Sequence, residues 1–156
     1  MIENIKNQEN SCDLVTCFEV LEHVYDPHLF IKNISNLLKP GGIMIVTTLS
    51  VDGFDIQFLW EKSEQISPPH HINFLSTKGF KHLFKRAGLN NIHVITPGVL
   101  DVDIVKNAIN KDQDLKEKNE FLSKLITNTS FSQKFQNLIT ESGLSSHDWI
   151  IAKEPI

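Results

Sequence analysis

The stretch that decides the fold is "CFEVLEHVYDPHLFIKNISNLLKPGGIMIVTT", residues 17–48. It begins at the end of an apolar run and passes through an acidic, histidine-containing segment into helix-like spacing. It then closes on a Lys-Pro-Gly-Gly turn and a second apolar run. With residues 12–16 added, it predicts a strand, a helix and a second strand. In one sheet, that connection is expected to be a right-handed crossover between parallel strands.

Both predicted strands, 12–18 and 43–49, are apolar at nearly every position. This is typical of parallel strands that are buried on both faces. The helix between them is expected to begin at Asp26 and Pro27, an N-cap followed by a first-turn proline. The turn at residues 39–42 is expected to end the helix, because proline and glycine do not continue it.

The rest of the chain continues the alternation of helices and strands. The prolines at 68–69 place His70 and His71 on a loop, and Ser76 is a candidate helix cap. The other expected elements are a short helix at 54–62, a helix from 77 that ends near Gly88, a strand at 91–97, two or three helical pieces within 101–143, and a last strand at 147–154. This pattern predicts an α/β fold with a mostly parallel sheet.

Composition limits the possible functions. The chain has 156 residues, 40% hydrophobic and 22% charged, which suits one globular domain. The net charge of −4 argues against a nucleic-acid partner. Cys12 and Cys17 fit neither a zinc motif nor a disulfide framework, so reduced thiols and a cytoplasmic location are expected. No apolar run approaches about 18 residues, so no membrane span is expected.

Three segments of the sequence resemble a known family. "EVLEHV" at 19–24 and "LLKPGG" at 37–42 resemble the end of the fourth strand and the approach to the fifth strand in class I S-adenosylmethionine-dependent methyltransferases. "PPHHINFLSTKGFKHLFKRAGL" at 68–89 resembles the next segment of many members. The resemblance covers most of 12–98. It implies a Rossmann-like methyltransferase fold whose last strand inserts antiparallel between the family's fifth and sixth strands.

One part of the family pattern is missing. The family binds its cofactor mainly through its first three strands, with a Gly-rich loop and an acidic residue that takes the ribose hydroxyls. Neither feature is found in this sequence. We therefore expect a single, partial methyltransferase domain that matches the family at 12–98, carries a helical insertion at 101–143 and ends with the strand at 147–154. The cofactor-binding half is expected upstream or on another chain.

The resemblance also implies which residues contact the cofactor. Ile2 corresponds to a position near the adenine, while Phe18 and Glu19 lie at the end of the family's fourth strand. These three residues are expected to contact S-adenosylmethionine. Because most of the family's other contacts are missing, the isolated chain is expected to be inactive.

An acidic and histidine cluster comes after the first strand. If the chain turns helical there, Glu19, Glu22 and His23 share one face, since they are spaced i, i+3 and i+4. His71, with His70 as the alternative, is expected to complete the cluster. Such ligands suit Mg²⁺ or Mn²⁺, as the resemblance to metal-assisted O-methyltransferases also implies. The alternatives are a metal-free general base at His23 or His71 and purely structural roles.

The predicted function is S-adenosylmethionine-dependent methyl transfer, to an oxygen of a small-molecule or sugar-like acceptor. A non-catalytic, partner-binding fragment is one alternative. A fragment of a metal-dependent RNA 2′-O-methyltransferase is another, which the negative net charge disfavours. Four other histidines, His28, His82, His93 and His147, stand outside any motif and are expected to have no role in the site. For Asp101 and Asp103, which follow a predicted strand, a helix N-terminal cap is the expected role, and a position facing the same pocket is the alternative.

Overall fold

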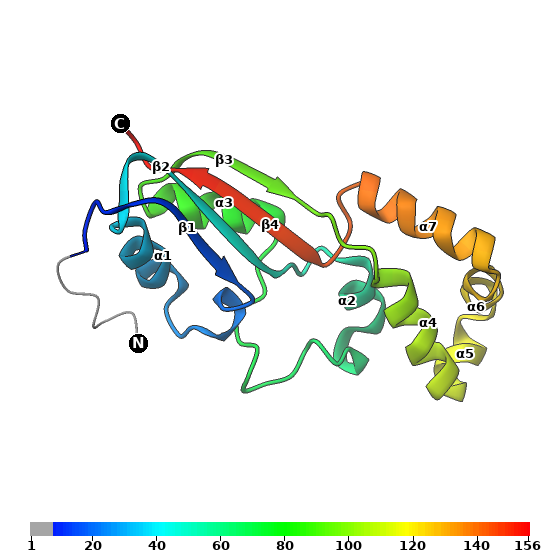
Figure 1. Ribbon diagram of the computed structural model, residues 1–156. Coiled ribbons are helices and arrows are strands. Elements are labelled where there is room, and N and C mark those ends of the chain that lie inside the picture. Colours follow the sequence, from blue (N-terminus) through cyan, green and yellow to red (C-terminus); the bar gives the residue numbers. More distant parts are fainter. Residues whose placement is uncertain (1–7) are drawn as a thin grey trace.

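The computed structural model describes residues 8–156 (Figure 1). The strands are β1 (Cys12–Phe18), β2 (Leu38–Leu49), β3 (Asn90–Ile95) and β4 (His147–Lys153). The helices are α1 (Pro27–Ser35), α2 (Phe54–Leu59), α3 (Thr77–Arg86), α4 (Asp101–Lys111), α5 (Gln113–Lys118), α6 (Glu120–Thr127) and α7 (Thr129–Glu141), with short 3-10 helices η2 (Leu21–His23) and η3 (Trp60–Lys62).

The four strands form one mixed sheet in the order β1-β2-β4-β3. β1 pairs with β2 in parallel, with Cys17 opposite Val46. β4 lies antiparallel between β2 and β3, which Figure 1 shows as the red arrow between the teal and green strands. The predicted antiparallel insertion of the last strand is therefore confirmed, and with it the Rossmann-like methyltransferase topology.

One face of the sheet carries the main core. Inward side chains of the strands pack against α1 and α3, which contact each other. In Figure 1, α3 lies behind the strands. The core residues include Ile31, Met44, Val46, Phe80, Phe84 and Ile150. Asp26 caps α1 and Ser76 caps α3, as predicted, because each side chain accepts a hydrogen bond from a first-turn amide.

The opposite face of the sheet is open near β1. Leu14 is 53% exposed and Phe18 is 56% exposed, and Ile43 on β2 is also exposed. The prediction that residues 12–18 are buried on both faces is therefore wrong for this structure. Side chains alternate along a strand, and within residues 8–156 only the α1 and α3 side of β1 is covered.

The Lys-Pro-Gly-Gly segment does not end a helix. α1 already ends at Ser35, and residues 39–42 lie inside β2. The register explains this difference, since Leu38 pairs with Cys12 while Ile43 pairs with Leu14. The chain between these pairs bulges out of the ladder, and Gly41 takes a φ of +80° there, a conformation that favours glycine.

The predicted helical insertion contains four helices, α4 to α7, instead of two or three. Asp112 caps α5 and Asn128 caps α7, and these caps divide the helical stretch. With α2, the insertion forms a second apolar cluster around Val105, Ile109 and Ile126. Figure 1 shows it beyond the end of the sheet where β4 begins. Within residues 8–156, no helix is both long enough and apolar enough to cross a bilayer.

Candidate active site at the end of the first strand

Glu22 is a buried carboxylate beside the carboxyl end of β1. It lies in η2 and is only 1% exposed. Its Oε2 accepts a hydrogen bond of 2.8 Å from the hydroxyl of Thr48 on β2. Burial of an acidic side chain requires such partners. The carboxylate is therefore held in one orientation by the neighbouring strand.

Two histidine rings lie next to Glu22. Nε2 of His23 is 3.9 Å from Oε1 of Glu22. The rings of His23 and His71 have centroids 4.7 Å apart. One possible ligand atom from each of the three residues lies within 4.8 Å of the others. Thus the structure brings together three of the four residues that the sequence predicted as metal ligands.

Backbone carbonyls set the orientation of both imidazoles. Nδ1 of His23 is 2.8 Å from the carbonyl oxygen of His70, and Nδ1 of His71 is 2.6 Å from that of Gln65. A carbonyl oxygen can only accept, so each Nδ1 carries the proton. In the neutral rings, each Nε2 then has a free lone pair. Such second contacts are typical of metal-binding histidines.

The loop that carries His71 is attached directly to η2. The amides of Ile72 and Asn73 donate to the carbonyl oxygen of Glu22 at 2.8 and 3.1 Å. The side-chain amide of Asn73 donates to the carbonyl oxygens of Leu21 and Val24. These bonds bring two segments that are distant in sequence to the same strand end.

Glu19 does not join this cluster. Its Oε1 accepts a hydrogen bond of 2.6 Å from Thr47, the residue before Thr48. Successive side chains of a strand point to opposite faces, so the two threonines hold the two glutamates on opposite sides of β2. Glu19 also has a φ of +51°. The expected helical face shared by Glu19, Glu22 and His23 is therefore not formed.

The other predicted site residues lie around this strand end or outside the described part of the chain. Phe18 is exposed at the end of β1, on the open face of the sheet. His70 contributes its backbone carbonyl to the cluster through His23. Ile2 lies outside the described residues, so its predicted contact with the adenine stays a prediction.

A cavity of about 430 Å³ lies on the Glu19 side of β2. Its lining includes Leu49, Leu100 and Trp149, together with Glu19 and His147. Nδ1 of His147 is 3.6 Å from Oε1 of Glu19. Sequence reasoning set His147 aside because no motif surrounds it. Its place beside Glu19 depends on the insertion of β4 next to β2, a long-range pairing without a local sequence signal.

Asp101 has a different role from the predicted cap. It is the first residue of α4 and is 2% exposed. Its carboxylate accepts hydrogen bonds from the hydroxyl of Ser145, the amide of Ser146 and the side-chain amide of Gln136. These contacts connect the helical insertion to the start of β4 and fix one wall of the cavity.

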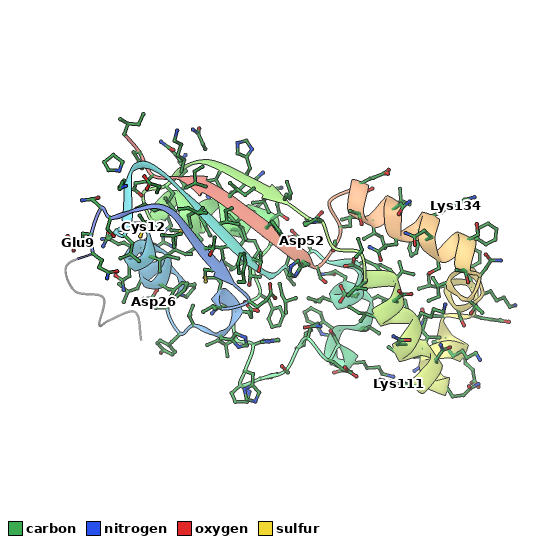
Figure 2. All side chains as sticks on the ribbon, viewed as in Figure 1. Glu9, Cys12, Asp26, Asp52, Lys111 and Lys134 are labelled. Carbon is green, nitrogen blue, oxygen red and sulfur yellow. The ribbon has the colours of Figure 1, made fainter. Side chains whose placement is uncertain are left out.

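Burial shifts the pKa of several groups around the sheet end. It raises the pKa of Asp148 to about 7 and the pKa of the Cys17 thiol to about 11. For Cys17, the negative charges of Glu22 and Glu19 act in the same direction. Asp52, labelled in Figure 2 near the junction of the sheet and the helical part, acts in the same direction on Asp148.

This fold is that of a methyltransferase. The family described as "Methyltransferase domain" matches residues 1–94, which is more than half of the chain, and the chain belongs to that family. The sheet order and the structural neighbours place it in the class I S-adenosylmethionine-dependent methyltransferase fold.

One group of curated relatives has short but clear similarity. "Ubiquinone biosynthesis O-methyltransferase" of Coxiella burnetii is 43% identical over 49 residues, which are 31% of this chain and 21% of that protein. The chain thus matches about a fifth of the length of these relatives.

Two solved structures share the fold. An S-adenosylmethionine-dependent methyltransferase of Thermotoga maritima, described as a possible histamine N-methyltransferase, has a TM-score of 0.62 and 18% identity, covering 99% of this chain and 61% of that one. Phosphoethanolamine N-methyltransferase 2 of Haemonchus contortus, solved with S-adenosyl-L-methionine, has a TM-score of 0.56 and 20% identity, covering 95% and 34%.

Proposed function

We propose that this chain is the acceptor-side part of an enzyme that transfers a methyl group from S-adenosylmethionine to a hydroxyl oxygen of a small molecule. The observation that carries the proposal is the cluster of Glu22, His23 and His71 at the carboxyl end of β1. Open α/β sheets bind their ligands at this end of the strands. The 49-residue similarity to O-methyltransferases supports oxygen as the atom methylated.

The residues at the end of β1 fit one edge of the cofactor. Phe18 offers an exposed aromatic ring there, and Glu19 offers a carboxylate beside it. The bound cofactor would supply an electrophilic methyl group. The chain would position the acceptor oxygen in line with that methyl group, which is the main catalytic task in such a displacement.

The cluster also fits a divalent cation. Glu22 and the two imidazoles offer oxygen and nitrogen ligands, and each ligand is oriented by a second contact from Thr48 or a backbone carbonyl. Mg²⁺ or Mn²⁺ suits this donor set. A cation held there would favour ionisation of an acceptor hydroxyl. Without a cation, His23 or His71 would be the candidate general base.

The remaining cofactor contacts would come from a part that covers β1. Leu14, Phe18 and Ile43 form an exposed apolar area on the open face of the sheet, and β1 is an edge strand within residues 8–156. Large exposed apolar areas mark interaction surfaces. We propose that strands bearing the Gly-rich loop pair with β1 and cover this face, either from the same gene product or from another chain.

The test fuses the cofactor-binding half of the Coxiella burnetii relative in front of this chain. Cofactor binding is measured by calorimetry, and transfer of a radiolabelled methyl group is measured with phenols, catechols and amines of similar size. We expect label on the hydroxyl compounds. Label on amines alone, or no transfer by a fusion that binds the cofactor, would contradict the proposal. The unfused chain is the matched control and should transfer no label.

A further inference from the structure

A second histidine and carboxylate pair lies outside the Glu22 cluster. His147 and Glu19 approach to 3.6 Å, measured from Nδ1 to Oε1. Both residues line the cavity of about 430 Å³ on the open side of the sheet. This volume is in the range of cavities that bind small molecules. The pair therefore lies where a ligand can reach it.

Strand pairing fixes both members of the pair. His147 is opposite Leu49 in the β2–β4 ladder, and Thr47 is opposite Trp149. The side chains of these four residues therefore lie on the open face of the sheet. Glu19 lies on that face too, because its Oε1 accepts a hydrogen bond from the hydroxyl of Thr47. His147 is partly exposed. The imidazole is thus held next to a fixed carboxylate while one side remains open to the cavity.

The carboxylate determines what the imidazole can do. A carboxylate only accepts hydrogen bonds, so the nitrogen that faces Glu19 is the one favoured to carry a proton. Nε2 is then free to accept a proton from a ligand. A carboxylate beside the other ring nitrogen is the arrangement of known carboxylate–histidine general bases.

The cavity walls define the class of acceptor. Leu49, Leu100 and Trp149 give it apolar surface, and among residues 8–156 no lysine or arginine lines it. The carboxylate of Asp101 is already occupied by donors from Ser145, Ser146 and Gln136. Glu19 accepts a hydrogen bond from Thr47 and lies 3.6 Å from Nδ1 of His147. Within residues 8–156, the walls therefore offer no lysine or arginine for an anionic ligand, and their two carboxylates are already in contact with other groups of the chain.

We propose that this cavity binds a neutral, largely apolar hydroxyl compound, such as a phenol, and that His147 is the catalytic residue that removes its proton. The proposal rests on the proposed methyl transfer to a hydroxyl oxygen, and it is the alternative to proton removal at the Glu22 cluster, which lies on the other side of β2. His147 would accept the hydroxyl proton at Nε2 and later release it to solvent. A bound cofactor would supply the methyl carbon to which the acceptor oxygen bonds, and its sulfur would keep the electron pair of the broken carbon–sulfur bond. Glu19 is a positioning residue that acts through His147.

The test measures binding to the chain itself, because His147, Glu19 and Trp149 all belong to it. The chain has two tryptophans. In a Trp60→Phe background, fluorescence therefore reports on Trp149 in the cavity wall. The probe is 4-nitrocatechol, whose absorbance changes when a hydroxyl ionises. We expect the probe to quench Trp149, and 3,4-dihydroxybenzoate to bind at least tenfold more weakly because of its carboxylate.

The role of His147 is tested by the ionisation midpoint of the bound probe. The titratable groups in the cavity wall are Glu19, Asp101 and His147. We expect His147→Gln to raise the midpoint by about one pH unit or more, a loss of about 1.4 kcal/mol per unit. His93→Gln is the matched control, because His93 is exposed on β3 of the same sheet, and it should leave the midpoint unchanged.

Three results would overturn this assignment. They are an unchanged midpoint in His147→Gln, tighter binding of the carboxylate analogue, and the absence of Trp149 quenching by the probe. Retained quenching in His147→Gln shows that the variant is folded. If the fused enzyme methylates only amines while the probe still ionises through His147, the proposed O-methylation and the catalytic role of His147 both fail, and only the binding of a hydroxyl compound beside His147 stands.

Discussion

Thr48 donates a hydrogen bond of 2.8 Å from its hydroxyl to Oε2 of Glu22, and both side chains are about 1% exposed. This contact satisfies a buried carboxylate oxygen and aims the other oxygen toward His23. It therefore affects both the stability of the sheet end and the geometry of the candidate site.

Thr48→Val should destabilise the chain, because it leaves one carboxylate oxygen buried without this donor. The expected loss is about 1–3 kcal/mol in the free energy of unfolding, measured by urea denaturation. Thr16→Val is the control, since Thr16 is an exposed residue of β1, and it should change stability by less than about 0.5 kcal/mol. Equal effects of the two substitutions would contradict the buried role of Thr48.

Asp148 should make the chain less stable as the pH rises toward neutrality. Burial raises its pKa from 3.8 to about 7, so between these values the folded chain holds a proton that the unfolded chain releases. The free energy of unfolding then falls with rising pH, by up to about 1.4 kcal/mol per pH unit from this group. Thr77 provides a hydrogen bond of only 3.4 Å to Oδ2.

Asp148→Asn isolates this effect, because the amide stays neutral throughout. The difference in stability between variant and wild type should shift in favour of the variant from pH 4.5 to pH 7.5, as measured by denaturation at each pH. Burial also raises the pKa of Asp55. That carboxyl remains in both proteins, so the comparison removes its contribution. A difference that does not change with pH would rule out a raised pKa at Asp148.

Much of the fold was predictable because its signals are local. The caps at Asp26 and Ser76 mark helix starts, and the apolar runs mark strands. The antiparallel last strand came from the family resemblance. The apolar residues of β1 could not by themselves indicate that one face of the strand is open, because exposure depends on what covers the strand. The end of α1 was misplaced for a related reason: the pairing of Leu38 with Cys12 begins β2 early.

The candidate site was only partly predictable. The spacing of Glu22 and His23 predicted that they lie together. The predicted loop at His71 was compatible with an approach of its ring to them. Spacing also suggested that Glu19 would join them, but hydrogen bonds to Thr47 and Thr48 separate the two glutamates. The approach of His147 to Glu19 depends on the order of the strands in the sheet, which no local sequence pattern predicts.

The chain by itself should bind S-adenosylmethionine weakly, because only the end of β1 offers predicted cofactor contacts within the described residues. Calorimetric titration of residues 1–156 should show no saturation at low-micromolar cofactor. The fusion with the Coxiella burnetii half should bind in that range. Low-micromolar binding by the unfused chain would show that the open face of β1 needs no further part to form the cofactor site.

The cation proposal leads to a test on the chain alone, because Glu22, His23 and His71 all belong to it. Mn²⁺ binding, measured by electron paramagnetic resonance, should weaken at least tenfold in Glu22→Gln, since the substitution removes a charged oxygen ligand from a site with two imidazoles. Thr48→Val should weaken binding less, about tenfold or below, because it alters only the orientation of Glu22. Glu64→Gln is the matched control, because Glu64 is an exposed glutamate outside the cluster.

Thermal unfolding of each variant separates loss of binding from loss of folding. Equal Mn²⁺ affinity in wild type and Glu22→Gln would exclude the cation. His23 or His71 would then remain as the candidate metal-free base on that side of the sheet.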